Sequence, residues 1–193
     1  MKCELLIMRH GKSDWSAAVD DLDRPLSKRG RGAARLMADW LRARELTPEL
    51  IIASPAVRAA ETCERVRKRL HLSLGQIVWD PRLYEASPET LMEVLRGLRE
   101  DVGRAMLIGH NPGLELLLEH LVGRVAAPGD GKLLPTAAIA RVALERRWPD
   151  IGQHCGALRA IVRPRDLAHD DHGGGGRPRR DKPRQRGRGL TGD

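Results

Sequence analysis

Short continuous apolar runs alternate with longer amphipathic segments through most of the chain. The length of each run, and its lack of polar positions, are typical of a strand that is buried on both faces. We expect four such strands, at residues 3–8, 49–53, 76–79 and 104–108. Strands that alternate with helices predict a parallel sheet.

The segments between these strands carry apolar residues at helical spacing. We expect helices over residues 27–44, 54–70, 88–98 and 111–121. Side chains that favour the N-cap position mark three of their starts. Ser27 is the expected cap of the first helix, whereas Ser54-Pro55 and Asn111-Pro112 predict a cap followed by proline in the first turn.

The last part of the chain has a different pattern. Residues 136–144 and 156–162 are strand candidates, separated by a turn-rich stretch without a strong helix signal. We expect them to pair with each other, and an antiparallel pair is one arrangement open to them. Together with the earlier alternation, they predict a three-layer α/β/α sandwich with a mostly parallel sheet and helices on both of its faces.

Composition divides the chain into a folded part and a tail. Hydrophobic residues make up 41% of the sequence and charged residues 31%, which is typical of a soluble globular protein. We expect one domain at residues 1–167 and a disordered tail at residues 168–193, rich in Gly, Arg and Pro. From His172 onward the tail carries seven Lys and Arg against two Asp, so it holds +5 of the formal net charge of +8.

Several features narrow the class of protein. No apolar run approaches the roughly 18 residues of a membrane-spanning helix, and the N-terminus does not read as a secretory signal. We therefore expect a cytoplasmic protein without membrane contact. Cys3, Cys63 and Cys155 lack CxxC spacing, which argues against a disulfide framework or a zinc site. The tail has no aromatic residue, so it predicts only nonspecific, salt-sensitive contact with nucleic acid.

Residues with catalytic chemistry follow each of the four predicted strands. Arg9 and His10 follow the first strand, Arg58 comes just after the second, Glu85 after the third and His110 after the fourth. In an open parallel sheet, ligands bind beyond the carboxyl ends of the strands. We therefore expect these side chains to meet at one edge of the sheet.

The residue types at this edge suit the transfer of a phosphoryl group. Arg9 and Arg58 are expected to grip its oxygens, because a guanidinium binds two oxygens in fork geometry. A neutral His10 would attack phosphorus, while the arginines and a protonated His110 stabilise the transition state. Glu85 would protonate the leaving group and then activate water. Since arginines supply the positive charge, we expect no metal and no other cofactor.

These motifs, in this order, resemble the histidine phosphatase superfamily, whose fold is called phosphoglycerate mutase-like. The sequence has RHG at residues 9–11, SPAVR ending at Arg58, LYE ending at Glu85 and GHNPG around His110. The stretches RHGKSDW, DLDRPLSKRGRGAA, LPTAAIARVAL and LRAIVRPRDL are similar to the SixA-type phosphohistidine phosphatases. The resemblance covers residues 2–167 and implies a phosphohistidine intermediate on His10.

One loop departs from the family pattern. Many members of the superfamily carry Asn a few residues after RHG, where this chain has Lys12-Ser13-Asp14-Trp15. Ser13 is the expected substitute as a donor to the phosphoryl group. The SixA branch depends less on a carboxylic acid, because imidazole is a good leaving group, so Glu85 carries less of the expected chemistry.

The spacing of the motifs bears on the substrate. Only 26 residues lie between Arg58 and Glu85, and 24 between Glu85 and His110, which leaves little room for a capping insertion. A shallow site suits phosphohistidine on another protein, and we expect a monomeric phosphatase with that substrate. Two alternatives stay open: a phosphatase or mutase for a small phosphorylated metabolite, and a nonenzymatic binding module that uses the basic tail.

Overall fold

The computed structural model of the chain describes residues 3–16, 18–127 and 131–168. Six strands form one sheet in the order β3-β2-β4-β1-β5-β6. They are β1 (Cys3–Arg9), β2 (Leu50–Ala53), β3 (Ile77–Trp79), β4 (Arg104–Gly109), β5 (Ile139–Leu144) and β6 (Gly156–Val162). The four early strands are confirmed, and none of their ends differs by more than one residue from the prediction.

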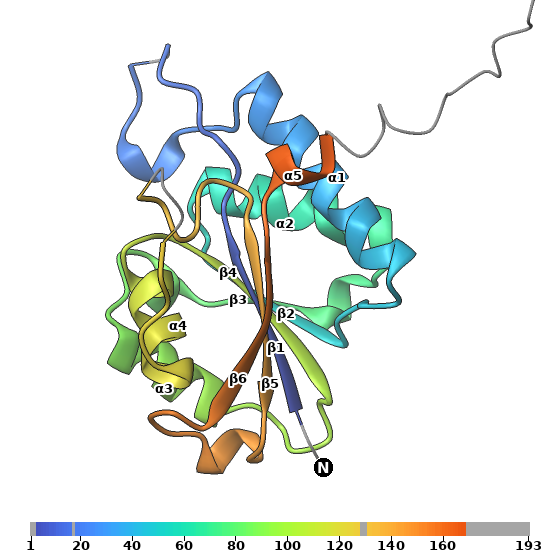
Figure 1. Cartoon of the computed structure of the whole chain (residues 1–193). Coiled ribbons are helices and arrows are strands. Elements are labelled where there is room, and N and C mark those ends of the chain that lie inside the picture. Colours follow the sequence, from blue (N-terminus) through green and yellow to red (C-terminus); the bar gives the residue numbers. More distant parts are fainter. Residues whose placement is uncertain (1–2, 17, 128–130, 169–193) are drawn as a thin grey trace, which may run out of the picture.

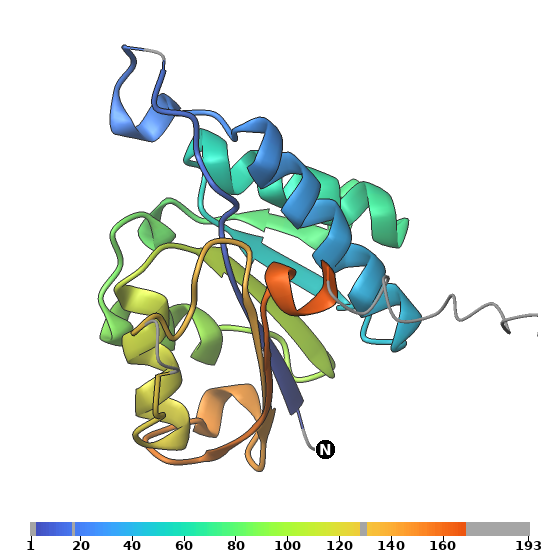
Figure 2. The same ribbon diagram turned by 45° about the horizontal axis from the view of Figure 1, so that its top comes forward.

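Helices cover both faces of this sheet. They are α1 (Lys28–Ala43), α2 (Val57–Leu70), α3 (Pro88–Arg96), α4 (Gly113–Val122) and α5 (Pro164–Ala168). Short 3-10 turns lie in the connections, at η1 (Asp21–Asp23), η2 (Leu74–Gln76), η3 (Pro81–Leu83) and η4 (Trp148–Asp150). Figures 1 and 2 show α1, α2 and α5 on one face and α3 and α4 on the other. The predicted three-layer α/β/α sandwich is confirmed.

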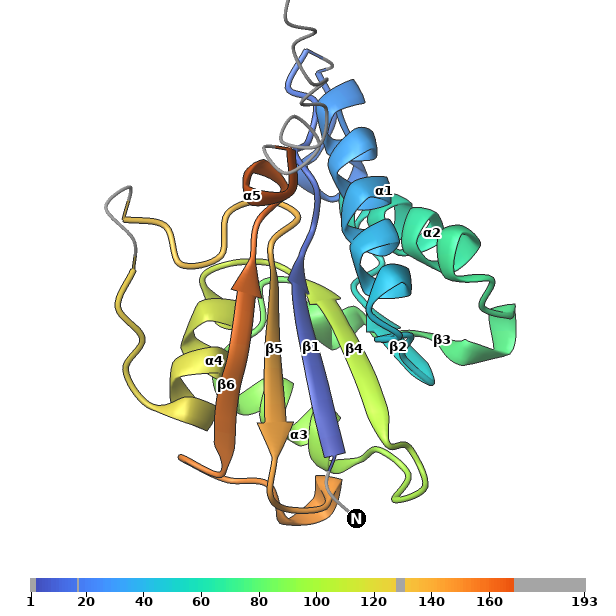
Figure 3. The same ribbon diagram turned by 45° about the vertical axis from the view of Figure 1, so that its right-hand side comes forward.

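The sheet is parallel on one side and antiparallel on the other (Figure 3). β1, β4, β2 and β3 pair in parallel, whereas β5 is antiparallel to β1 and β6 is antiparallel to β5. The expected pairing of the late strands is thus confirmed as antiparallel. β5 begins at Ile139 instead of residue 136, because Ala137 has a φ of 63° and its N–H points back to the carbonyl groups of Arg9 and His10.

Side chains of the central strands alternate between two hydrophobic cores. Leu5 and Ile7 of β1 pack in the core beneath α3 and α4, while Leu6 and Met8 pack in the core beneath α1 and α2. All four are fully buried. β4 alternates in the same way, which is why a continuous apolar run marks both strands.

The start of α1 packs closely on the loop that follows β1. Ser27 caps the helix as predicted, since its hydroxyl accepts from the N–H of Gly30 at 3.1 Å. The Ser27 hydroxyl also donates to the carbonyl oxygen of Lys12 at 2.9 Å. A Cβ on Gly30 would lie 2.1 Å from that same oxygen, so the close approach of helix and loop requires glycine. The start of α1 therefore supports the loop that follows β1, which carries His10.

Two predictions about the ends of the chain stay predictions. Residues 169–193, nearly all of the predicted tail, lie outside the described residues, so neither its disorder nor the domain boundary is tested. Among the residues that the structure describes, no helix is long and apolar enough to cross a membrane.

Candidate active site

The predicted site residues line one cavity of about 870 Å3 at the carboxyl edge of the sheet. His10 follows β1 and His110 follows β4, and their ring centroids lie 5.0 Å apart because the two strands are parallel neighbours. The cavity contains every predicted site residue: Arg9, His10, Ser13, Arg58, Glu85 and His110. The expected convergence at one edge therefore occurs.

The His10 imidazole is buried, and its contacts define its tautomer. Its Nδ1 lies 2.7 Å from the carbonyl oxygen of Gly11, which only accepts, so Nδ1 carries the proton. The lone pair is then on Nε2, which faces Nε of Arg58 at 3.4 Å. Burial, together with the nearby arginines, lowers the pKa of His10 to about 4. The ring is neutral at pH 7, as a nucleophile must be.

Arg58 reaches the cavity from the first turn of α2. That helix begins at Val57 with Ala56 at the N-cap, so the prediction that Ser54 caps it is wrong. The Ser54 hydroxyl instead accepts from the N–H of Ala56 at 3.3 Å, within the turn that precedes the helix. Thr62, one turn further along, accepts from the N–H of Gly11 at 3.0 Å and thereby ties α2 to the loop that carries His10.

The Arg58 guanidinium joins both histidines to an acidic residue. Its Nε donates to Nε2 of His10, and its Nη2 lies 3.3 Å from Nδ1 of His110. Nη2 also donates to the Asp21 carboxylate at 2.8 Å, and Nη1 donates to the Asp21 carbonyl oxygen. Arg58 is only 7% exposed, so its contacts with the two histidines are shielded from water.

His110 has the opposite tautomer to His10. Arginine only donates, so Nδ1 of His110 accepts from Arg58, and the proton on Nε2 donates to the Ser54 hydroxyl at 2.8 Å. Burial lowers the pKa of His110 to about 3, and the positive charges nearby act in the same direction. The ring is therefore neutral at pH 7 in the free protein, and the protonated His110 that we expect in the transition state stays a prediction. A phosphoryl dianion beside the ring would favour the imidazolium, because an opposite charge raises the pKa of a histidine.

The carbonyl oxygen of Leu134 holds two side chains of the cavity wall. Nη1 of Arg9 and Nδ2 of Asn111 both donate to it at 3.0 Å. The prediction that Asn111 caps α4 is wrong, since that helix begins at Gly113 after a cis Asn111–Pro112 bond. Nε of Arg9 is buried without a hydrogen-bond partner among the described residues.

Ser13 and Glu85 also line the cavity, and neither forms a hydrogen bond with His10 or His110 among the described residues. Ser13 is buried and forms an isolated bridge with Leu26. Glu85 is exposed and has a left-handed backbone, with φ at 49°. Within the described part of the chain, its carboxylate makes no hydrogen bond or ion pair. Their roles toward a phosphoryl group stay predictions.

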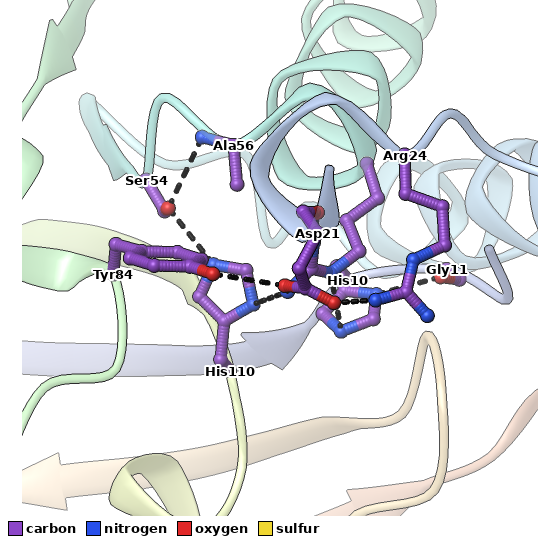
Figure 4. Close-up of polar contacts among 9 residues, drawn as sticks. His10, Gly11, Asp21, Arg24, Ser54, Ala56, Tyr84 and His110 are labelled. Atoms are coloured by element: carbon purple, nitrogen blue, oxygen red, sulfur yellow. Dashed lines mark hydrogen bonds and ion pairs between the residues drawn. The ribbon is translucent and has the colours of Figure 1, made fainter. Parts of the chain in front are cut away.

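Sequence reasoning missed Asp21, Arg24 and Tyr84, which lie close to the two histidines (Figure 4). The Asp21 carboxylate accepts from the Tyr84 hydroxyl at 2.9 Å and forms an ion pair with Arg24. Tyr84 also packs edge-on against His110, with centroids 5.4 Å apart. Asp21 and Arg24 come from an irregular polar loop, where no periodic pattern marks a functional side chain.

The cavity lining is strongly basic. Among the described residues, its acidic members are Asp21, Glu85 and Glu115, and its basic members are Arg9, Lys12, Arg24, Arg29, Arg58, Lys132, Arg163 and Arg165. No group of three or more His, Cys, Asp or Glu side chains is placed to hold a metal ion anywhere in the described ranges. The lining suits an anionic ligand that is bound through guanidinium groups.

The sequence is similar to a protein family and to individual relatives. Residues 5–96 match the histidine phosphatase superfamily (branch 1). The phosphohistidine phosphatase SixA of Escherichia coli (strain K12) is 33% identical over 144 residues, which cover 74% of this chain and 86% of that protein. An uncharacterised protein of Mycobacterium tuberculosis (strain H37Rv) is 31% identical over 164 residues, which cover 82% of this chain and all of that protein, 100%.

Solved structures share the architecture. The protein histidine phosphatase SixA complexed with tungstate superposes with a TM-score of 0.72 at 30% identity, covering 85% of this chain and 99% of that one. A mycobacterial glucosyl-3-phosphoglycerate phosphatase gives a TM-score of 0.58 at 20% identity, covering 82% of this chain and 97% of that one. At this lower identity, the second likeness shows the fold alone.

Proposed function

The chain belongs to the histidine phosphatase superfamily, in its SixA-type branch, and from this premise we propose that it removes the phosphoryl group from phosphohistidine on another protein. The family and the phosphoglycerate mutase-like fold that the motifs predicted are confirmed, as is the class of enzyme, a phosphatase. One observation carries the proposal: a neutral imidazole with its lone pair on Nε2 lies beside Arg58 in a basic cavity.

In the proposed reaction, His10 acts as the nucleophile. Its Nε2 forms a bond to phosphorus while the bond between phosphorus and the substrate breaks, which leaves a phosphoryl group on His10. The ring becomes cationic in this step, and the hydrogen bond from Nδ1 to Gly11 holds its proton in place. Water then releases phosphate and returns His10 to its neutral form.

The side chains around His10 would stabilise the transition state. Arg9 and Arg58 are proposed to hold the phosphoryl oxygens, with His110 as a third donor once the dianion has raised its pKa. Ser13 is a further candidate donor. Glu85 is proposed to accept a proton from water in the second step and, with an ester substrate, to transfer a proton to the leaving oxygen in the first, because it lines the same cavity.

The connection between α2 and α3 supports a protein substrate. Residues 71–87 form η2, the edge strand β3 and η3, and they add no separate domain over the cavity. A phosphohistidine that projects from a protein surface would need such an uncovered site. A small phosphorylated metabolite is the alternative, and the experiment below separates the two. A cytoplasmic location and a monomeric state stay predictions.

The test compares wild type with His10→Ala on histidine-phosphorylated protein, p-nitrophenyl phosphate and phosphoglycerates. We expect wild type to turn over the phosphoprotein fastest and to form an acid-labile phosphoenzyme. His10→Ala should lose both, with turnover reduced on the order of a thousandfold or more, as when another nucleophile is removed. The control is His120→Ala, which should behave as wild type because His120 does not line the cavity.

The possible results are distinct. Equal turnover by His10→Ala and wild type would reject His10 as the nucleophile. Turnover of phosphoglycerates without turnover of the phosphoprotein would favour the metabolite alternative.

A further inference from the structure

The carboxylate of Asp21 contacts Arg58, one of the residues proposed to hold the phosphoryl group. Asp21, in η1, accepts from Nη2 of Arg58 at 2.8 Å and from the Tyr84 hydroxyl at 2.9 Å, and it pairs with Arg24. Its side chain is 44% exposed and lines the cavity, so it lies on the solvent side of the site. The Arg58 guanidinium links this carboxylate to the nucleophilic Nε2 of His10.

This placement has an electrostatic cost for most phosphate esters. A phosphoryl dianion and an anionic leaving group both meet a like charge at Asp21, and like charges a few ångströms apart repel strongly in a partly buried site. A cationic leaving group experiences the opposite effect. The charge at Asp21 therefore distinguishes between leaving groups by their sign.

Phosphohistidine has a leaving group of the favoured sign. When its N–P bond breaks, the electron pair of that bond stays on the departing ring nitrogen, while Nε2 of His10 forms the new N–P bond. The ring departs as neutral imidazole only if its other nitrogen already carries a proton. The reactive form of the substrate ring is therefore a cation with one outward N–H.

The Asp21 carboxylate has the capacity to bind that N–H. A carboxylate offers about four acceptor positions, and the Arg58, Tyr84 and Arg24 contacts occupy three of them. The guanidinium of Arg24 lies 3.4 Å from the centroid of the Trp15 ring, which holds this side of the pair in place. The carboxylate is therefore fixed, charged and accessible.

The other acids of the cavity are less well placed. Glu115 accepts the N–H of Leu134 at 2.7 Å, so its carboxylate is engaged with the backbone beside Arg9. Glu85 makes no contact with Arg58 within the described part of the chain. Among the described acids that line the cavity, Asp21 is the one in contact with Arg58.

We propose that Asp21 determines substrate specificity by accepting a hydrogen bond from the protonated imidazole of phosphohistidine, so that the site selects N–P over O–P substrates. This inference rests on the proposed function. In the step it assists, the N–P bond of the substrate breaks, the N–P bond to His10 forms, and the proton stays on the outward nitrogen of the departing ring. Asp21 remains a carboxylate throughout.

The test measures kcat/KM of wild type and Asp21→Asn with a phosphohistidine peptide and with p-nitrophenyl phosphate. Asparagine has the same shape without the charge. We expect about a tenfold loss with the phosphohistidine peptide, the effect of one charge interaction near a protein surface. With p-nitrophenyl phosphate we expect a rise, because the anionic nitrophenolate no longer meets a carboxylate. The alkaline limit of phosphohistidine turnover should also move to lower pH.

Two variants serve as controls. Asp23→Asn makes the same change of charge two residues away, at an exposed position outside the cavity lining, and should keep the wild-type ratio of the two kcat/KM values. Asp21→Glu keeps the charge and should keep the preference for the phosphohistidine peptide. Asp21→Ala, measured alongside, should shift the ratio in the same direction as Asp21→Asn.

Failure of this inference differs from failure of the proposed function. Wild type that does not hydrolyse the phosphohistidine peptide overturns both. Wild type that does, with an unchanged ratio in Asp21→Asn, overturns only the role of Asp21. An equal gain on both substrates also overturns it, because Asp21 would then be only an internal anion that competes with the phosphoryl group.

Discussion

His10 and His110 lie in the same buried environment but carry their protons on different ring nitrogens. The Gly11 carbonyl holds the proton of His10 on Nδ1, whereas the Ser54 hydroxyl holds that of His110 on Nε2. Both free lone pairs point at Arg58, which has donors for both. Arg58 therefore contacts both imidazoles in the free protein and adds to the hydrogen bonds from Gly11 and Ser54 that orient them.

Both histidines should stay neutral well below the usual pKa of the side chain. Burial lowers the pKa of His10 from 6.5 to about 4 and that of His110 to about 3. Imidazole NMR of the free protein should show neither ring titrating between pH 5 and 8. Titration of either ring near pH 6.5 would contradict the buried arrangement.

The same depressed pKa values make stability depend on pH. Between about pH 4 and 6.5 the unfolded chain binds protons at these two positions and the folded chain does not. The free energy of unfolding should therefore fall as the pH falls through this window. Chemical denaturation at several pH values measures the slope, and the double variant His10→Gln/His110→Gln should flatten it.

At the scale of elements, α1 acts as a rigid support for the loop that carries His10. Gly11 and Gly30 face each other, and a Cβ on Gly11 would lie 2.8 Å from the carbonyl oxygen of Gly30. Backbone therefore meets backbone at this contact, and neither side has a flexible side chain that could move aside.

A single added methyl group should displace this support. Gly30→Ala would place a Cβ 2.1 Å from the Lys12 carbonyl oxygen, so we expect a loss of roughly 1–3 kcal/mol or more in stability, together with reduced phosphatase activity. Gly32→Ala is the matched control in the same helix. Its Cβ would meet no atom within 4 Å, so it should stabilise the protein by up to about 1 kcal/mol. Thermal unfolding of both variants tests this difference in stability. Equal melting temperatures would contradict the packing argument.

The predictable part of the site is the part that regular elements position. Apolar runs located β1 and β4, and their parallel pairing brought His10 and His110 together. The helix starts at Ser54 and Asn111 were misjudged because each side chain makes a tertiary contact instead of a cap, one with His110 and one with Leu134. Local sequence favours capping at both positions, and contacts between distant elements outweigh it.

Asp21 was beyond sequence reasoning for a different reason. Its loop has no periodicity, and its contacts with Arg58 and Tyr84 join residues that are far apart in the chain. A charged residue in a polar loop is more often solvated than functional. Only the folded arrangement distinguishes Asp21 from its neighbour Asp23.

At the scale of the molecule, every side chain to which we assign a catalytic role precedes the basic end of the chain. Among the described residues, the cavity lining runs from Arg9 to Arg165, within α5. A chain that ends after Ala168 should therefore keep wild-type kcat/KM on p-nitrophenyl phosphate. It should lose salt-sensitive binding to DNA, because the removed residues 169–193 hold the excess of Arg.

The outcome of this truncation also bears on the alternative of a binding module. Full retention of phosphatase activity would assign catalysis to the described part of the chain alone. A large loss of turnover with no loss of folded structure would show that the basic end contributes to the site.

The position of β4 restricts when the enzyme becomes active during synthesis. β4 separates β1 from β2 in the sheet, although it is translated after both, and His110 follows it directly. A ribosome-bound chain that has released only residues 1–96 lacks β4, the strand that pairs with both β1 and β2 and leads directly to His110. We therefore expect the nascent protein to be inert until this late strand inserts between β1 and β2 and brings His110 beside His10.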